Sequence, residues 1–279
     1  MNCKILVCLV AGILVSSGCG DEPQLPSISA ESGYGRIAVY GDTRTNHGDH
    51  RNVVAAIMRE NPEVVFHTGD LVDNGLEEDQ WVVFDDITGR LRERAEFFPA
   101  IGNHERNSRL YFDHFELPNN ERWYSVEREG IDFIILDSCE GIEAGSRQYR
   151  WLENELQGGG SDFTAVLFHH PPYSTGPHGE DEMNLRETVV PLFEEHRVSA
   201  VFNGHDHIYE RSFKGGVHYV VAGGGGAPLY EQERDSEYSQ KFLSIHHYCM
   251  ISAEGDSMVV TAIDTLGNVF DRFSVRAGR

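Results

Sequence analysis

Residues 200–207 read Ala-Val-Phe-Asn-Gly-His-Asp-His, an apolar run that leads into two histidines one residue apart. Alternate residues of an extended segment point to the same side, so the side chains of His205 and His207 can enter one pocket. The stretch therefore predicts a buried strand that delivers two imidazoles just past its C-terminal end.

Four other apolar runs end in the same manner, with Asp, Asn or His just past the last apolar residue. They end at Gly41-Asp42, Gly69-Asp70, Gly102-Asn103-His104-Glu105 and His169-His170-Pro171-Pro172. In open α/β sheets, ligands bind outside the carboxyl ends of the strands. Carboxylate, amide and imidazole groups together suit divalent transition metals, and more than one ion. We therefore expect a metal site at this edge.

The order of the strand and helix patterns predicts the fold class. Apolar residues with helical spacing follow the first, second and later strands, at 53–58, 76–97, 147–156 and 185–196. From Val217 the pattern changes to consecutive strands, at 217–222, 248–252, 258–264 and 269–275. Such an order favours two packed sheets with helices outside. We expect an α/β protein, a four-layer α-β-β-α sandwich of two mixed β-sheets flanked by helices.

Composition narrows the class of partner. The chain has 279 residues, 40% of them hydrophobic, and a formal net charge of −22. This apolar fraction supplies a core for one large domain. The acidic excess leaves no long basic stripe to neutralise phosphates, so a nucleic acid is not expected as the main partner. No pattern in the sequence indicates an oligomeric state.

The N-terminus has the pattern of a secretory signal. An apolar run at 5–15 is too short to span a bilayer. Ser16-Ser17-Gly18-Cys19 resembles a bacterial lipobox, whose cysteine becomes the lipidated N-terminus. The predicted division is a signal peptide at 1–18, a tether at 19–33 and a single domain at 34–279. The protein would then be exported and anchored to a membrane through Cys19, in the periplasm or at the cell surface. The alternative is ordinary cleavage and a free secreted protein.

Two cysteines, Cys139 and Cys249, lie beyond the predicted lipidation site. In an oxidising compartment they could pair. Cysteines in separate apolar segments are more often small buried side chains. The sequence leaves both interpretations open.

The five strand-end blocks together resemble the calcineurin-like metallophosphoesterase superfamily, and within it the purple-acid-phosphatase-like branch. The resemblance runs from about Arg36 to Arg211, where Ile208-Tyr209-Glu210-Arg211 follows the last block. Any one block is weak, but five in the right order are specific. The resemblance implies a hydrolase of phosphoric esters, either mono- or diesters.

The resemblance also implies a ligand set for two divalent or trivalent transition-metal ions, such as Fe, Mn or Zn. Asp70 would bridge the two ions, and a metal-bound hydroxide would attack phosphorus. Asp42 and His207 would complete the first position. The second position would be completed by Asn103, His169 and His205.

Three further roles follow from the resemblance. His104, which is not a ligand in the family, would contact the phosphate and protonate the leaving oxygen. Asp73 matches the acid that orients this histidine in the protein-phosphatase branch. His178, in a predicted lid at 173–183, lies where purple acid phosphatases place a histidine that contacts substrate.

The sequence departs from the family at Arg44 and Asp73. Most of the superfamily has a histidine where this chain has Arg44, and arginine cannot be a ligand because it stays protonated. The first metal therefore lacks a ligand unless His50 or His47 supplies one. Arg44 could instead bind phosphate as a bidentate donor. The tyrosine that ligates iron in one branch is replaced here by Asp73.

The remaining histidines are expected to have structural or supporting roles. His170 is interpreted as a lid or supporting residue, and His67 as a core or supporting residue. Surface or structural roles are expected for His114, His196, His218, His246 and His247. A different class of function also stays open, namely a binding protein that kept the fold and lost the chemistry, which Arg44 favours.

Overall fold

Two mixed β-sheets form the centre of the fold, as predicted. The first sheet contains, in spatial order, β13 (Val269–Arg276), β12 (Ser257–Asp264), β11 (His247–Glu254), β1 (Ile37–Tyr40), β2 (Val64–His67) and β3 (Glu96–Pro99). Strands β1, β2 and β3 are parallel, whereas β11 to β13 run antiparallel. The computed structural model describes residues 35–179 and 181–277.

The second sheet combines a parallel centre with antiparallel edges. Its spatial order is β10 (Ser239–Leu243), β8 (Tyr209–Lys214), β9 (Val217–Ala222), β7 (Ala200–Asn203), β6 (Phe163–Leu167), β5 (Ile131–Ile135) and β4 (Tyr124–Arg128). Strands β5, β6, β7 and β9 are parallel. Strands β4 and β5 form an antiparallel hairpin, and β8 and β10 are not among the predicted strands.

Successive side chains of a strand point to opposite faces of the sheet, and this alternation explains how the two sheets pack. Val39 and Phe66 of the first sheet belong to the same buried cluster as Phe133 and Phe202 of the second. The rings of Phe66 and Phe133 stack with their centroids 4.2 Å apart, so the sheets meet face to face. Tyr40, next to Val39, belongs to a different cluster on the outer face. Strands covered on both faces read as continuous apolar runs, as these do.

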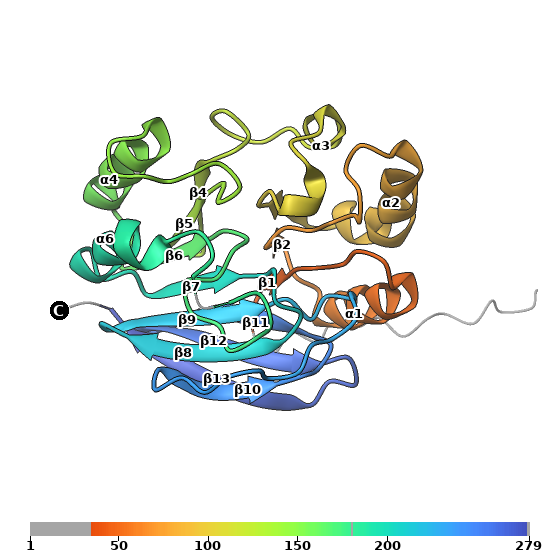
Figure 1. Ribbon diagram of the computed structural model, residues 1–279. Coiled ribbons are helices and arrows are strands. Elements are labelled where there is room, and N and C mark those ends of the chain that lie inside the picture. Colours follow the sequence, from red (N-terminus) through yellow and green to blue (C-terminus); the bar gives the residue numbers. More distant parts are fainter. Residues whose placement is uncertain (1–34, 180, 278–279) are drawn as a thin grey trace, which may run out of the picture. The chain divides into compact units, whose positions relative to one another are not determined.

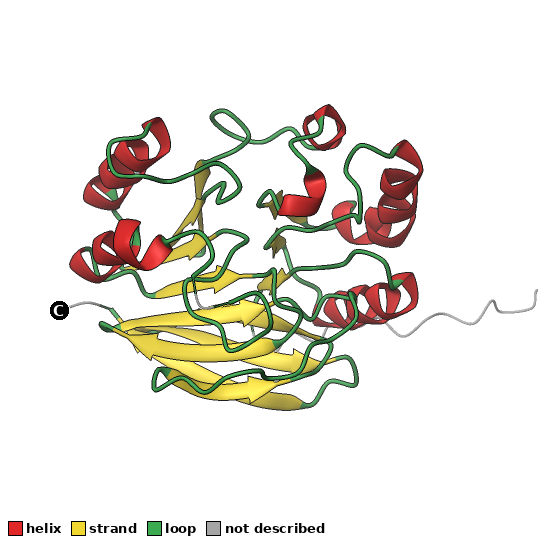
Figure 2. Ribbon diagram, viewed as in Figure 1, coloured by secondary structure: helices red, strands yellow, loops and turns green. Residues whose placement is uncertain are grey.

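Helices cover the outer face of each sheet (Figures 1 and 2). On the first sheet, α1 (His47–Glu60) and α2 (Glu78–Arg92) bury Val53 and Leu91 against Tyr40. On the second sheet, α4 (Arg147–Gly158), α5 (Leu185–Thr188) and α6 (Val190–Glu195) pack against Val166 and Val201. The predicted sandwich of two mixed sheets flanked by helices is therefore confirmed.

Three local features differ from the sequence prediction. Helix α1 begins at His47, before the helical spacing recognised at 53–58, so His50 lies within the helix. The helix predicted at 185–196 is divided into α5 and α6, and Pro191 near the start of α6 explains the break, since proline cannot continue a helix. Two short helices, η1 (Asn103–Glu105) and α3 (Arg109–His114), were not predicted.

Strand register brings the site residues to one edge. Tyr40 pairs with His67, and His67 pairs with Pro99, so β1, β2 and β3 end side by side. Leu167 likewise pairs with Phe202, which aligns the ends of β6 and β7. The polar blocks that follow these strands therefore start from one edge of each sheet.

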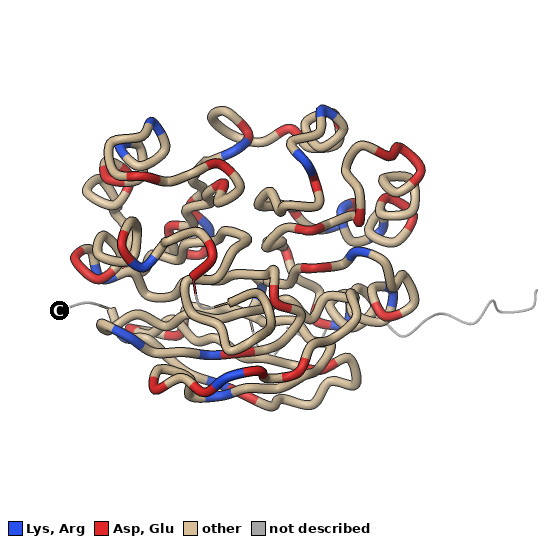
Figure 3. Tube along the Cα trace, in the orientation of Figure 1, with Lys and Arg blue, Asp and Glu red and all other residues tan. Residues whose placement is uncertain are grey.

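The described chain carries dispersed acidic groups (Figure 3) and two free thiols. Acidic positions are spread over helices and loops along the described chain (Figure 3). Cys139 is an exposed free thiol, and Cys249 is a buried one. No helix among residues 35–179 and 181–277 is long and apolar enough to cross a membrane. The predicted signal peptide, the tether and Cys19 lie outside the described residues.

Candidate metal centre

Three predicted site residues have left-handed backbone conformations. The φ angles of Asp42, Asp70 and His205 are 59°, 57° and 70°. Each directly follows a glycine that lies just past the end of a strand. Such angles cost non-glycine residues on the order of 1–3 kcal/mol and persist only where the surroundings fix them. The main-chain N–H of His205 donates to both carboxylate oxygens of Asp42, at 2.9 and 3.1 Å, which ties the two sheets together.

Glycines are required at two strand ends because the backbone there lies against Asp70 and Asp42. A Cβ atom at Gly102 would overlap the main-chain nitrogen and the carboxylate of Asp70, and one at Gly204 would overlap the carboxylate of Asp42. Only glycine lets the strand ends come this near to the two aspartates. The repeated glycine before each polar residue is thus part of the site.

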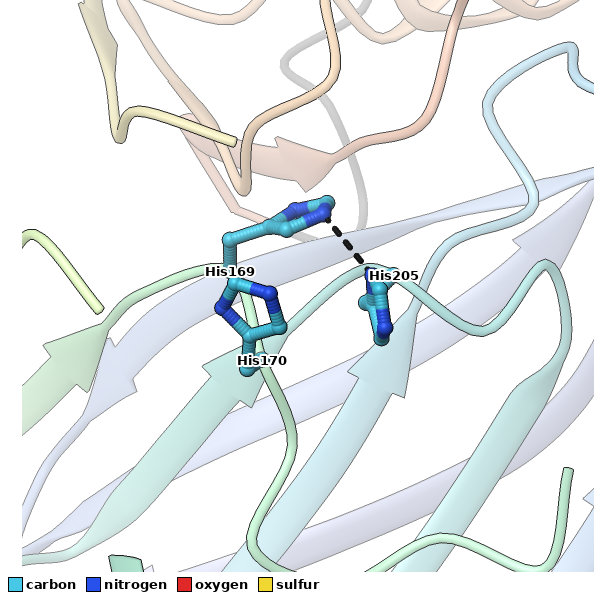
Figure 4. A group of neighbouring side chains, drawn as sticks. All are labelled: His169, His170 and His205. Carbon is cyan, nitrogen blue, oxygen red and sulfur yellow. Dashed lines mark hydrogen bonds between the residues drawn. The ribbon is translucent and has the colours of Figure 1, made fainter. Parts of the chain in front are cut away.

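Four donor atoms converge at the second predicted metal position. His169 Nε2 lies 2.9 Å from Asn103 Oδ1 and 3.3 Å from Asp70 Oδ1. His205 Nδ1 lies 3.1 Å from Asn103 Oδ1 and 3.2 Å from His169 Nε2; Figure 4 shows the two rings meeting. Ligands about 2.1 Å from one ion lie about 3.0–3.4 Å apart in octahedral or tetrahedral geometry. The four residues therefore fit one transition-metal ion.

Hydrogen bonds on the far side of each ring fix which nitrogen faces the centre. His169 Nδ1–H donates to the carbonyl of Thr68 at 3.0 Å, and His205 Nε2–H donates to the Glu182 carboxylate at 3.0 Å. Histidines that bind metals usually make such a bond, which orients the ring and leaves the other nitrogen for the ion. His207 shows the same arrangement, since its Nδ1–H donates to the carbonyl of Pro228 at 2.7 Å.

The electrostatics of the buried carboxylates also favour a cation. Asp42 and Asp70 have exposed fractions of 0% and 1%. Burial raises the pKa of Asp42 well above its usual value. Burial lowers the pKa of His169, but the charge and hydrogen bond of Asp70 and the charge of Asp42 outweigh it and raise this pKa to about 9. A cation would take over the neutralising role of the proton on His169.

The first predicted metal position contains the guanidinium of Arg44 as well as possible metal ligands. His207 Nε2 lies 3.8 Å from Asp42 Oδ1, but the guanidinium of Arg44 lies beside the same group. Arg44 Nε is 3.4 Å from Asp70 Oδ2, and Arg44 Nη2 is 3.3 Å from His207 Nε2. A guanidinium stays charged and has no lone pair to offer. The residues at this position therefore do not fit a second cation.

His50 does not complete the first position, contrary to one of the sequence hypotheses. Its ring packs between Tyr40 and Phe84, with centroids 6.1 and 5.9 Å away. Burial first, and then the charges of His47 and Arg51, lower the pKa of His50 to about 3. Helix α1 explains the difference, because His50 is one turn before Val53 and Val54 on its buried face. His50 is thus a core histidine.

His104 is oriented by Asp73, but through a different atom from the one predicted. Its Nδ1–H donates to the main-chain carbonyl of Asp73 at 2.6 Å, whereas the Asp73 carboxylate is 3.6 Å away. That carboxylate instead lies 3.3 Å from Arg44 Nη1. His104 Nε2 points towards Asp70 Oδ2, at 3.8 Å, so its free nitrogen faces the site. The predicted carboxylate–histidine dyad is corrected to a carbonyl–histidine pair.

His178 lies at the mouth of the site. Its ring centroid is 4.1 Å from that of His205, and its Nδ1 lies 2.8 Å from Asp206 Oδ1. Ser174 donates to the other oxygen of Asp206, and the N–H of Thr175 donates to Glu210 at 2.7 Å. These contacts fasten residues 174–178 over the end of β7.

His170 stands beside the donor cluster. Its ring is 4.5 Å from that of His205 (Figure 4), and its Nδ1 is 2.9 Å from Ser138 Oγ. His67 Nδ1 accepts the N–H of Gly69, and its Nε2 lies 3.3 Å from Thr43 Oγ1, next to Asp42. Both agree with supporting roles. Outside the donor cluster, His114 stacks on Trp81, His218 packs on Phe273 and His247 packs on Tyr209.

Sequence reasoning missed three residues around the site. The buried carboxylate of Glu105 accepts the N–H groups of Asp70, Leu71 and Gly102 at 2.9, 2.9 and 2.7 Å. It therefore holds the loops after β2 and β3 together. Glu182 orients His205, and Tyr230 stacks on His207 with centroids 4.2 Å apart. Glu105 belongs to a quoted block and could have been noticed, whereas Glu182 and Tyr230 carry no local signature.

The two-sheet fold and its cluster of Asp, Asn and His at the strand ends define an α/β protein with a metal-binding edge. The chain belongs to the calcineurin-like phosphoesterase family, whose sequence pattern matches residues 35–209.

Several similar proteins are purple acid phosphatases. Purple acid phosphatase 15 from Arabidopsis thaliana is 25% identical over 71% of this chain and 46% of its own length. The Fe(3+)-Zn(2+) purple acid phosphatase 12 from the same plant is 30% identical over 49% of this chain and 31% of its own length. The chain thus spans about half or less of the length of these relatives.

A solved structure shares the fold. The purple acid phosphatase PPD1 from yellow lupin (Lupinus luteus) seeds has a TM-score of 0.76 and 19% identity, with 88% of this chain and 54% of that chain covered. At this identity the likeness concerns the fold.

Proposed function

We propose that the protein is a metal-dependent hydrolase of phosphoric esters. The observation that carries this proposal is the convergence of Asn103, His169 and His205 on Asp70, with donor atoms 2.9–3.3 Å apart. Membership of the calcineurin-like phosphoesterase family and the purple acid phosphatase relatives support the same reaction class.

Asp70, Asn103, His169 and His205 would hold the metal. One ion bound there would polarise a phosphoryl oxygen and lower the pKa of a coordinated water. Imidazole, amide and carboxylate donors suit Fe, Mn or Zn. The name of one relative specifies Fe(3+) and Zn(2+), which supports the same choice of metals here.

The chain's own residues would divide the remaining tasks. Arg44 offers a fork of N–H donors to two phosphate oxygens. The carbonyl of Asp73 holds the Nδ1–H of His104, so that Nε2 faces the site. In the imidazolium form of the ring, which carries a second proton on Nε2, that proton would pass to the leaving oxygen. A positioned acid of this kind contributes about 10²–10⁴-fold. His178, 35% exposed and anchored by Asp206, would contact the substrate from residues 174–178.

Hydrolysis of 4-nitrophenyl phosphate and of bis(4-nitrophenyl) phosphate tests the reaction class. We expect turnover of one or both esters that is lost after chelation and restored by added Mn²⁺. Asp70→Asn should abolish it, while Asp79→Asn, on the exposed surface of α2, serves as the matched control. Folded protein that binds Mn²⁺ but hydrolyses neither ester would favour the alternative of a binding protein.

We also propose that the protein is exported and held at a membrane through lipid on Cys19. Support comes only from the lipobox-like sequence Ser16-Ser17-Gly18-Cys19. Expression in a bacterium with a metabolic fatty-acid label should label the full chain and place it in the membrane fraction. Cys19→Ser should lose both label and membrane association. A labelled or membrane-bound Cys19→Ser protein would contradict the proposal.

A further inference from the structure

We propose that this site takes a single metal ion, and that the guanidinium of Arg44 stands where a second ion would otherwise bind. The inference deepens the proposed function, on which it rests for the identity of the site. It contradicts the pair of ions that the family resemblance implies.

The described donors are sufficient for one ion. Among the described residues, two groups of side chains have ligand atoms within 4.8 Å of one another: His169, His170 and His205 form one, and Asp42, Asp70 and His169 form the other. Both depend on His169, whose Nδ1–H is already used by the carbonyl of Thr68. Only its Nε2 is left, and one nitrogen lone pair serves one metal. The two groups therefore compete for one ligand.

Without His169, the first position has Asp42, Asp70 and His207 as its donors. Arg44 is already in contact with two of these three, at 3.4 Å from Asp70 Oδ2 and 3.3 Å from His207 Nε2. Asp42 uses both carboxylate oxygens as acceptors for the N–H of His205. A second cation would have to displace the guanidinium of Arg44 from Asp70 and His207.

The fold places the guanidinium firmly. The side chain of Arg44 has an exposed fraction of 16%, and Asp73 Oδ1 lies 3.3 Å from Nη1 on the outer side. The preceding residue, Thr43, is pinned by two bonds: its N–H donates to the carbonyl of Asp70 at 3.0 Å, and its hydroxyl donates to the carbonyl of Leu71 at 2.9 Å. Arg44 is therefore presented to the site by the same two strand ends that carry the aspartates.

This arrangement gives the two positions different properties. The ion beside His169 can be removed by a chelator, whereas the charge of Arg44 cannot, because a guanidinium neither dissociates nor loses its proton. The site would keep the guanidinium of Arg44 as a permanent anion-binding group whether or not the metal ion is bound. Phosphate binding should therefore persist, more weakly, in protein freed of metal.

Metal stoichiometry tests the inference without reference to activity. The full-length protein, freed of metal and dialysed against Mn²⁺, should retain one Mn²⁺ per chain by elemental analysis. Its electron paramagnetic resonance spectrum should be that of isolated Mn²⁺, without spin coupling between neighbouring ions. Two tightly held ions, or a coupled spectrum, would overturn the inference even if the ester assays succeed. One ion without ester hydrolysis would leave it standing and remove the proposed function instead.

Substitution of Arg44 tests whether this residue excludes the second metal ion. Arg44→His supplies an imidazole in place of the guanidinium and should raise the content from one to two ions with a coupled spectrum. Arg44→Lys keeps the charge and, as the matched control, should stay at one. A folded Arg44→His protein that still binds one ion would show that Arg44 is not what excludes the second. If Arg44→His does not fold, the stoichiometry and spectrum of the unmodified protein decide alone.

Discussion

The two halves of the site share Asp70 but differ in what surrounds it. On one side, Asn103, His169 and His205 place possible metal-ligating atoms 2.9–3.2 Å apart. On the other side, Asp42 and His207 are 3.8 Å apart and Arg44 brings its own positive charge. Strand ends carry the residues of both halves, yet only one half consists of groups that can all act as metal ligands.

The difference shows that two kinds of group, a metal ion or a guanidinium, can supply positive charge beside buried carboxylates. A buried carboxylate pair needs positive charge nearby, since burial without it raises the free energy of the ionised form. A metal ion provides that charge and also vacant coordination positions for substrate and water. A guanidinium provides the charge and directional hydrogen bonds, but no vacant position. The halves are therefore expected to respond differently to substitution.

Asp70→Asn removes the residue common to both halves, so it should have the largest effect. We expect the rate of ester hydrolysis to fall by at least about 10³-fold. Loss of the metal removes several kcal/mol of transition-state stabilisation, and each loss of about 1.4 kcal/mol lowers the rate tenfold. Metal content and kcat/KM, measured on the same samples, check the result. Asp79→Asn should retain both. An Asp70→Asn protein with full metal content and rate would refute the central role of this residue.

His104→Gln tests a residue that belongs to neither half. We expect kcat to fall by about 10²–10⁴-fold for esters with a basic leaving group, because the proton donor is lost. Metal content should stay unchanged, since His104 is not among the converging donors. Nitrophenyl esters, whose leaving groups need less protonation, should be affected less. An equal loss for both kinds of ester would contradict the assignment of His104 as proton donor.

His169→Ala and His207→Ala form a direct test of the comparison. We expect the first to weaken Mn²⁺ binding by more than about 100-fold, because even supporting residues of metal ligands cost about 10–100-fold. The second should leave the Mn²⁺ affinity close to that of the unmodified protein. Isothermal titration calorimetry on the metal-free proteins measures both. Equal losses would mean that the halves are equivalent, as in a site for two ions.

Glu182→Gln should have the smallest effect. Glu182 accepts the Nε2–H of His205 but its side chain is 54% exposed, so solvent screens much of its charge. We expect Mn²⁺ affinity to fall by about tenfold, at the low end of the range for such partners. Glu187→Gln, on the nearby helix α5, is the control. A loss as large as that of His169→Ala would make Glu182 itself a ligand.

Much of the candidate site could be predicted from the sequence. The six residues Asp42, Asp70, Asn103, His169, His205 and His207 follow apolar runs, and the structure brings all of them to one edge. The prediction succeeds because each block is local: a short buried strand, a glycine where the backbone comes close, then a polar residue. His50 was assigned to the site because its place in α1 was not recognised from the spacing of His50, Val53, Val54 and Ile57.

The sequence by itself determined which residues stand at the strand ends, and hence the fold class and the family. Only the tertiary structure decided how they meet. Arg44 and His207 are 163 positions apart, and nothing in either segment specifies their contact. The same holds for Glu182 beside His205 and for the carbonyl of Asp73 beneath His104. Strand ends follow from local periodicity, whereas the balance of charge between two sheets depends on contacts that form only once both sheets are packed.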